Sequence, residues 1–267
     1  MLNAQAIQAA ADALYTAEKT RKQTRALTLS HPTMNMDDAY AIQRAWVDRK
    51  IADGDRITGY KIGLTSRAMQ QAMHIDTPDF GILLESMFFA NGSTISTENF
   101  CDPRIEVELG FVMKKPLFGD NVSVEDVLDA TDYIVPALEL IAARSHRVDP
   151  ETGYTRKVFD TIADNAANAG YIVGDNTFSP NEIDLRWSGA ILYLNGEVEE
   201  TGLAAGVMDH PAKGICWVCE RFAAHGIGLS PGDFILSGSF TRPVIANAGD
   251  NMHCDFGPLG AIDVDFI

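Results

Sequence analysis

Residues 103–113 read PRIEVELGFVM, and the alternation within this stretch decides how the chain is interpreted. Apolar residues occupy every second position from Ile105 to Phe111, the pattern of a β-strand with one face in a protein core. Glu106 and Glu108 stand between them, so both carboxylates emerge on the opposite face, about 6–7 Å apart along the strand. Taken alone, the pair also fits an amphipathic strand whose polar face contacts water.

A second apolar segment carries a third carboxylate. In YIVPALELI, residues 133–141, Glu139 is the one charged side chain. Buried carboxylates cost several kcal/mol each when unpaired, and three of them close together also repel one another. A hard dication bound by Glu106, Glu108 and Glu139 would remove both penalties. Because no histidine or cysteine stands at a suitable spacing, the residues predict Mg²⁺, with Mn²⁺ as an alternative, and leave coordination positions for water and substrate.

The composition is that of a globular protein with an acidic surface. Of the 267 residues, 46% are hydrophobic, and the formal net charge is -16. Such a surface repels nucleic-acid phosphates and anionic membranes, which argues against both as partners. An anionic substrate would need positive charge within the site itself. The chain opens on no signal-like segment, no apolar run reaches the roughly 18 residues of a membrane span, and four cysteines fit a reducing compartment, so a cytoplasmic location is expected.

The pattern along the chain predicts an α+β protein. A helical N-terminal region, residues 1–55, precedes a β-rich catalytic body, residues 56–267, and the two are expected to form one continuous functional unit. Apolar periodicity and capping residues place helices over 4–27, from Asn35 as N-cap to Gly54, from Ser123 onward, and over 211–224. Apolar or alternating runs place strands at 57–64, 81–89, 105–113, 133–142, 168–174, 186–195, 233–238 and 261–266.

Two short motifs add detail to this outline. Asn195-Gly196, between apolar runs, predicts a β-hairpin. Cys216 and Cys219, in CWVC, fall within the last expected helix, where they share a face. They are interpreted as core thiols, with a redox or metal site as the alternative.

Several segments resemble a known family. The carboxylate segments PRIEVELGFVM and VPALEL, together with KIGLTS at 61–66, KVFDTIADNAANAG at 157–170 and SGSFTRPV at 237–244, resemble the hydratase branch of the fumarylacetoacetate hydrolase superfamily. The likeness covers essentially the whole chain in the same order. It implies a mixed β-roll or sandwich fold with a small helical N-terminal region. It also implies a metal held by the same three glutamates, and a homo-oligomer of high order, such as a decamer.

The resemblance also implies an activity. The expected reaction is metal-dependent hydration of 2-oxo-hept-4-ene-1,7-dioate, or its dienol 2-hydroxyhepta-2,4-diene-1,7-dioate, to 4-hydroxy-2-oxoheptane-1,7-dioate in homoprotocatechuate catabolism. Alternatives within the family are a 4-oxalocrotonate-type decarboxylase and a 2-hydroxypenta-2,4-dienoate hydratase. A further alternative is a partner subunit of a sister enzyme, and association with the downstream aldolase is also expected. The additional aspartate ligand and the His–Glu pair of the hydrolase branch have no obvious counterpart here, which argues against C–C bond hydrolysis.

Proton transfer requires a movable acid or base near the metal. Lys61, in GYKIGLTS, is the first candidate because an apolar segment would partly desolvate its ammonium group beside the metal. A surface lysine that extends to solvent is the alternative. Asp79, in TPDFG, is a second acid–base or orienting candidate, or else a turn aspartate bonded to its own backbone.

Other residues are candidates for holding the substrate. Ser239 and Thr241 are expected to bind its C1 carboxylate, with a plain Gly/Ser turn as the alternative, and Asn168 to hydrogen-bond it, unless that amide only forms a turn. A second carboxylate needs positive charge, which the loop after the second acidic strand supplies. Arg144, Arg156 and Lys157 are therefore candidates to select a dicarboxylate, unless they are solvated loop charges.

Overall fold

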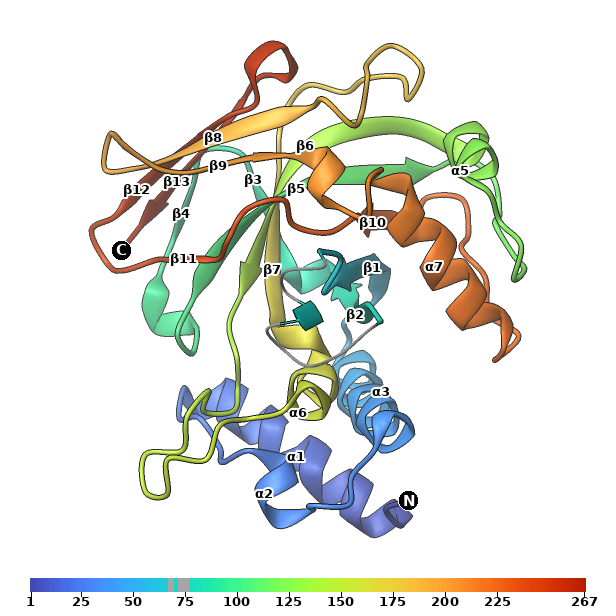
Figure 1. The fold of residues 1–267 in the computed structure, drawn as a ribbon. Helices are drawn as coiled ribbons and strands as arrows, with labels where there is room; N and C mark the ends of the chain where they lie inside the picture. The colour runs from blue at the N-terminus through green and yellow to red at the C-terminus, as the bar shows by residue number, and fades with distance from the viewer. Residues whose placement is uncertain (67–69, 72–76) are drawn as a thin grey trace.

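The structure is a computed structural model that describes residues 1–66, 70–71 and 77–267. Two mixed β-sheets pack together, and a layer of helices packs against the larger sheet from one side (Figure 1). The helices are α1 (Ala4–Thr20), α2 (Leu27–Ser30), α3 (Met36–Ala52), α5 (Val124–Ala130), α6 (Val158–Ala163) and α7 (Ala212–Ala223). This arrangement confirms the predicted mixed fold with a helical N-terminal region.

The larger sheet follows the order β2-β1-β10-β5-β6-β7-β3, with β11 beside β5. Its strands are β1 (Ile57–Gly63), β2 (Asp79–Leu84), β3 (Phe88–Ala90), β5 (Arg104–Met113), β6 (Thr131–Ile141), β7 (Asn168–Val173), β10 (Phe234–Leu236) and β11 (Val244–Ile245). β1 and β10 pair in parallel, as do β3 and β7, whereas the other pairs of this sheet are antiparallel. The central strands β5 and β6 are therefore supported on both sides.

The second sheet follows the order β4-β13-β12-β8-β9. Its strands are β4 (Ser93–Ile95), β8 (Gly189–Leu194), β9 (Glu197–Leu203), β12 (Asn251–Asp255) and β13 (Ala261–Phe266). The predicted hairpin joins β8 to β9, where Asn195 and Gly196 have φ values of 54° and 85°, the left-handed conformation that these residue types tolerate. The apolar side chains of this sheet and those of β5 form one core with α5 and α7.

The register between β5 and β6 fixes which side chains share a face. Glu106 lies directly opposite Glu139, and Val107 lies opposite Leu138. The alternating apolar residues of β5, among them Val107, are fully buried in the core between the sheets. The glutamates of β5 consequently share the opposite face with the glutamate of β6.

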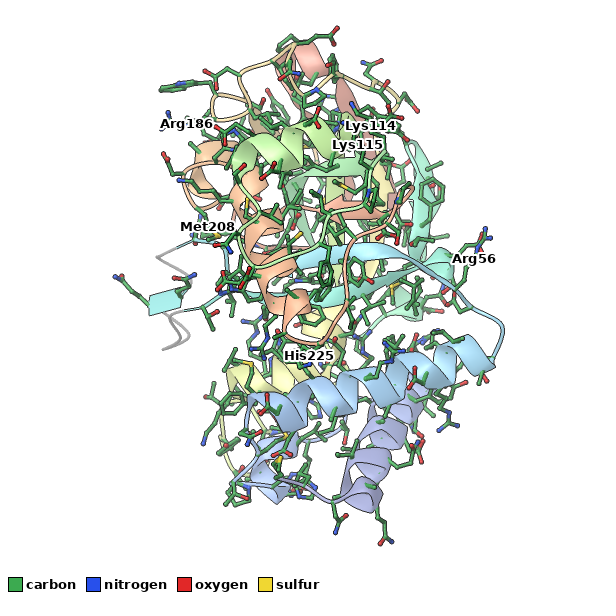
Figure 2. The ribbon with its side chains drawn as sticks, turned by 90° about the vertical axis from the view of Figure 1, so that its right-hand side faces the viewer. Arg56, Lys114, Lys115, Arg186, Met208 and His225 are labelled. Atoms are coloured by element: carbon green, nitrogen blue, oxygen red, sulfur yellow. The ribbon has the colours of Figure 1, made fainter. Side chains whose placement is uncertain are left out.

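The helical layer rests on capping and on a second core. Asn35 caps α3 in a reciprocal capping box with Asp38, as its sequence position predicts. Leu14 of α1 and Trp46 of α3 are buried with Leu83 of β2, so this core extends from the N-terminal helices into the β-rich body. Figure 2, turned by 90°, shows these helices packed along one side of the sheet layers.

Several expected boundaries are wrong. The helix expected over 4–27 ends at Thr20, because Thr24 instead exchanges backbone hydrogen bonds with the chain at Arg144 and His146. The strand expected at 81–89 is divided between β2 and β3 by a 3-10 turn over Glu85–Met87. Short elements without a strong pattern, α2, α6, β4, β11 and β12, were not predicted, and β9 was implied only as the second strand of the hairpin.

The four cysteines are free thiols. Burial raises the pKa of Cys216 to about 11 and that of Cys219 to about 12, so neither is a thiolate near neutral pH. Both lie on α7, as predicted, with Cys219 in the core. Within the described residues, no helix combines the length and the apolar character that crossing a membrane requires.

Candidate metal centre and active site

Three carboxylates converge at the centre of the larger sheet, on the face turned away from the core between the sheets. Glu106 and Glu108 come from β5, and Glu139 comes from β6. One oxygen from each lies within 4.8 Å of the others. Glu108 and Glu139 are almost completely buried, at 1% and 0% exposure, and Glu106 is half-buried. The strand register therefore places the three predicted residues where one ion could contact all of them.

Neighbouring groups fix the orientation of two of these carboxylates. Glu108 accepts a hydrogen bond from the backbone N–H of Gly238 at 2.8 Å. Glu139 Oε1 accepts one from Asn168 Nδ2, also at 2.8 Å. The other oxygen of Glu139, Oε2, is buried and has no hydrogen-bond partner among the described residues. A buried carboxylate oxygen without a donor indicates a position for a cation.

The electrostatics of the cluster favour a cation as well. Burial and the nearby Glu139 carboxylate raise the pKa of Glu106 to about 8, and the same two causes raise that of Glu108. Without a bound cation, the three carboxylates therefore resist being ionised at the same time. Because the donors are all carboxylate oxygens, the site fits a hard dication such as Mg²⁺. It would be held by Glu106, Glu108 and Glu139.

Lys61 and Asp79 enter the same site from neighbouring strands. Lys61 Nζ of β1 lies 3.4 Å from Glu139 Oε1, and both side chains are buried. Burial lowers the pKa of Lys61, but the surrounding carboxylates, Glu139 foremost, raise it by more, so Lys61 is an ammonium ion. Burial raises the pKa of Asp79 to about 6 despite the opposing effect of Lys61. Asp79 Oδ1 is buried without a hydrogen-bond partner among the described residues.

Gly63 makes room for this pair of side chains. It lies on β1 directly opposite Asp79 of β2. A Cβ atom at this position would lie 2.2 Å from Asp79 Oδ1 and 3.0 Å from Lys61 Nζ. The glycine of the Lys-Ile-Gly motif is therefore required by close approach, a role that the sequence pattern did not reveal.

A cavity of about 440 Å³ opens over the carboxylates and Lys61. Ser239 and Thr241, on the loop after β10, line it as predicted candidates, and so does Arg156. The hydroxyl of Thr241 accepts a hydrogen bond from Val107 N, and that of Ser239 donates within its own loop to Thr241 O. These bonds hold both residues at the cavity wall.

Two residues expected to bind substrate do not line this cavity. The side-chain amide of Asn168 donates a hydrogen bond to the carboxylate of Glu139. Arg144 is 3% exposed, pairs with Asp164, and lies over the ring of Trp46. Its guanidinium also donates to the Asn168 carbonyl oxygen. Arg144 therefore joins the helical layer to the sheet, and loop position alone could not distinguish it from its basic neighbours.

Comparisons with known proteins identify the family of this chain. Residues 58–266 match the family model described as fumarylacetoacetate (FAA) hydrolase C-terminal. The chain belongs to the fumarylacetoacetate hydrolase family. It is 55% identical over 251 residues to 2-oxo-hept-4-ene-1,7-dioate hydratase from Escherichia coli, a match that covers 94% of each chain.

Other members of the fumarylacetoacetate hydrolase family match over nearly their full length. The identity to 2-keto-4-pentenoate hydratase from Paraburkholderia xenovorans is 36%, over 96% of this chain and 93% of the relative. Among solved structures, 4-oxalocrotonate decarboxylase from Pseudomonas putida G7, complexed with magnesium and adipate, has a TM-score of 0.95. Its identity is 32%, over 100% of this chain and 99% of that one.

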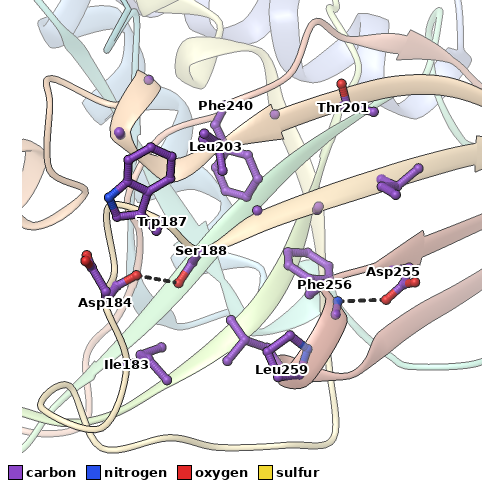
Figure 3. Close-up of a pocket in the computed structure, with 18 residues that line it drawn as sticks. Ile183, Asp184, Trp187, Ser188, Thr201, Leu203, Phe240, Asp255, Phe256 and Leu259 are labelled. Atoms are coloured by element: carbon purple, nitrogen blue, oxygen red, sulfur yellow. Dashed lines mark hydrogen bonds between the residues drawn. The ribbon is translucent and has the colours of Figure 1, made fainter.

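This member of the fumarylacetoacetate hydrolase family has a second, larger cavity of about 1010 Å³ beside the first (Figure 3). Its walls are mainly apolar, and Trp187 is 70% exposed at its edge. Its two acidic residues belong to local turns: the backbone carbonyl of Asp184 accepts from Ser188, and the Asp255 side chain accepts from Gly257 N. Because no titratable groups converge among the described residues of its lining, this cavity is not the candidate active site.

Proposed function

We propose that the chain hydrates 2-oxo-hept-4-ene-1,7-dioate to 4-hydroxy-2-oxoheptane-1,7-dioate in aromatic catabolism. The observation that carries this proposal is the convergence of three glutamates and Lys61 in one cavity. The 55% identity to a hydratase of that name supports the choice of substrate. The enzyme is accordingly a hydro-lyase.

The metal that fits this site is Mg²⁺, with Mn²⁺ as an alternative. When bound, a dication supplies Lewis-acid polarisation of the 2-oxo group and holds the adjacent C1 carboxylate. Glu106, Glu108 and Glu139 would hold it, and Asn168 keeps Glu139 in position through its amide. The related decarboxylase, whose structure contains magnesium, supports this assignment.

The reaction requires two proton transfers at carbon. The dienol is the enol tautomer of 2-oxo-hept-4-ene-1,7-dioate, whose C4=C5 bond is not conjugated to the 2-oxo group. Ketonisation of the dienol transfers the 2-hydroxyl proton to a base in the site and adds a proton at C5, which moves the double bond to C3=C4, in conjugation with the 2-oxo group. The oxygen of water then bonds to C4, one of its protons is removed, and a proton is added at C3. The ammonium group of Lys61 is the proposed donor at carbon, and Asp79, with its pKa near 6, is the proposed acceptor from water.

Ser239 and Thr241 are proposed to bind the C1 carboxylate end of the substrate. Both line the cavity that also contains the three glutamates. The Thr241 hydroxyl oxygen accepts from Val107 N, and no acceptor for its own proton occurs among the described residues. That proton is available to a carboxylate oxygen.

The proposed activity is tested with purified protein, Mg²⁺ and 2-hydroxyhepta-2,4-diene-1,7-dioate. Loss of the dienol absorbance should accompany a product heavier by one water. Replacing Glu106 with Gln should abolish both, whereas Glu199→Gln, at an exposed position on β9, should change neither. A wild-type protein that consumes no dienol would overturn the proposal.

Decarboxylation is the second candidate reaction. It is favoured by the TM-score of 0.95 to 4-oxalocrotonate decarboxylase, since that enzyme has the same fold over the whole chain. The electron pair left by CO₂ must enter the dienolate, so the distal carboxylate has to be attached to C5, as in 4-oxalocrotonate, one carbon shorter than the proposed substrate. CO₂ release from 4-oxalocrotonate, measured beside hydration of the seven-carbon dienol, separates the two reactions. CO₂ equal to the substrate consumed would establish decarboxylation.

We further propose a cytoplasmic homo-oligomer, such as a decamer, that associates with the downstream aldolase. The free cysteines fit a reducing compartment. Exposed apolar side chains such as Trp187 and Leu203, at 70% and 43% exposure, fit subunit contacts. Light scattering gives the subunit number, and co-elution with the aldolase tests the association.

A further inference from the structure

The charges around the cavity differ from those of the whole protein. Among the described residues, the lining contains five carboxylates and four cationic side chains, although the chain as a whole carries a net charge of -16. A bound dication would therefore leave the lining with net positive charge. The cationic side chains are Lys61, Arg147, Arg156 and Arg242.

The four cationic side chains differ in whether they already form an ion pair with a carboxylate. Lys61 pairs with Glu139, and Arg242 pairs with Glu200 at the cavity rim. Arg147 and Arg156 form no ion pair with any carboxylate of the described residues. These two guanidinium groups therefore remain available to an anion in the cavity.

One loop places both guanidinium groups at the same wall. Arg156 N donates to Arg147 O at 3.0 Å, and a β-bridge joins Val148 to Thr155, so the two arginines are neighbours across a short antiparallel turn. Arg147 is exposed and Arg156 is half-buried. Within the described residues, the guanidinium of Arg156 has one hydrogen bond, a 3.4 Å contact from Nη1 to Ser145 O.

A neutral donor also lines this cavity. Thr161, on α6, follows this loop and lines the cavity. Its Oγ1 atom is buried and has no hydrogen-bond partner among the described residues. A buried hydroxyl without a partner requires a ligand or a water for its proton.

We propose that Arg147, Arg156 and Thr161 form the subsite for the distal, C7 carboxylate of the substrate. This inference rests on the proposed function, which places the 2-oxo acid end of the substrate at the three glutamates. Two guanidinium groups and a hydroxyl match the planar oxygens of a carboxylate. The subsite thus selects 2-oxo dicarboxylates over 2-oxo monocarboxylates of equal length, a selection that sequence alone assigned partly to the buried Arg144.

The test uses two unreactive ligands that differ only in the distal group, 2-oxoheptanedioate and 2-oxoheptanoate. Their dissociation constants for the Mg²⁺-loaded protein are measured by calorimetry for the wild type, Arg147→Met, Arg156→Met and Thr161→Val. Arg56→Met is the matched control, since Arg56 is exposed, does not line the cavity and lies at the surface in Figure 2. Arg147→Lys and Arg156→Lys retain the positive charge but lack the planar set of N–H donors of a guanidinium group.

The dioate should bind the wild type more tightly than the monocarboxylate. Each Arg→Met change should weaken dioate binding about 10- to 100-fold and Thr161→Val about 2- to 10-fold, with monocarboxylate binding changed less than about 3-fold. The lysine variants should recover part of the loss, and Arg56→Met should behave as the wild type. Equal weakening of both ligands, or no dioate preference in the wild type, would overturn the subsite.

Dienol turnover by the same wild-type preparation separates this inference from the proposed reaction. Selective dioate binding without hydration would leave the subsite established and reject the activity. Hydration at equal efficiency for dioate and monocarboxylate dienols would support the activity and reject the subsite. Because Arg147 is exposed, its variants should fold even where Arg156→Met does not.

Discussion

Among the described residues, Lys61 contributes the one ammonium group beside the carboxylates at the centre of the site. Replacing it with Met should lower kcat by about 10²- to 10⁴-fold, the usual contribution of a positioned proton donor. Mg²⁺ affinity should not fall, because the change removes a positive charge next to Glu139. Initial rates of dienol loss and calorimetric Mg²⁺ titration measure the two effects.

Lys114→Met is the control for Lys61, since Lys114 is exposed and lies at the surface in Figure 2. It should retain wild-type rates and metal affinity. A Lys61→Met protein that loses its metal together with its activity would show that the lysine stabilises the carboxylates rather than transferring a proton.

The raised pKa values of Glu106 and Glu108 make metal binding depend on pH. Both carboxylates must be ionised to bind a dication, and the pKa of Glu106 is about 8. Mg²⁺ affinity should therefore rise between about pH 6 and pH 8, with protons released on binding. Calorimetry in buffers of different ionisation enthalpy counts those protons. An affinity that does not change over this range would contradict the raised pKa.

The raised pKa of Glu106 also makes the stability of the metal-free protein depend on pH. The folded-state pKa of Glu106 is raised above its ordinary value of 4.5, so the folded state binds more protons than the unfolded state between the two values. Its free energy of unfolding should therefore fall as pH rises from about 5 to about 8. Saturating Mg²⁺ should remove this fall, and Glu106→Gln should weaken it. Thermal unfolding with and without a chelator measures both.

The pair of strands β1 and β2 positions Lys61 and Asp79 only if Gly63 has no side chain. Gly63→Ala would bring a methyl group to 2.2 Å from Asp79 Oδ1. Displacement of the proposed acid and base should lower kcat at least about 100-fold, because proton transfer requires hydrogen-bond geometry. Gly206→Ala is the control: it also lines the cavity, but its nearest contact is 3.8 Å away and its φ is not left-handed. Equal rates for both variants would contradict this role.

Elements with strong periodicity or caps could be predicted from the sequence, and irregular ones could not. β5 and β6 alternate clearly, and Asn35 and Ser123 cap their helices through reciprocal bonds. α6 could not be predicted, since it has six residues and its packing against α3 depends on the tertiary structure.

The site was predictable to the extent that it lies on regular strands. Alternation and burial cost place the three glutamates together, since they occur on the paired strands β5 and β6, whereas the structure was needed to place Asp79 on β2 opposite Gly63 of β1. Arg147 could not be found this way, because a loop does not fix which side chains turn toward a cavity, and Thr161 could not, because it lies on the short helix α6, which was not predicted. For the same reason Arg144 could not be distinguished from Arg156 until the ion pair with Asp164 was visible.

At the scale of the molecule, the helical layer and the β-rich body share one core. Leu14 of α1 is fully buried in it with Leu83 of β2. Leu14→Ala should lower the free energy of unfolding by about 2–5 kcal/mol. The unfolding transition followed by tryptophan fluorescence should still coincide with the one followed by circular dichroism. Two separated transitions would indicate that the N-terminal helices unfold independently; Ala9→Gly, at an exposed position of α1, is a milder control.

The direct opposition of Glu106 and Glu139 limits how such a chain can change over evolutionary time. Successive residues of a strand face opposite ways, so a one-residue insertion or deletion ahead of Glu106 would carry its carboxylate into the apolar interior. Loops that border the cavity, such as the turn between Arg147 and Arg156, are not subject to this alternation, so their length can change without reversing the face of a strand. Descendants of this sequence that acquire new substrates are therefore expected to diverge in those loops while the two central strands keep their length.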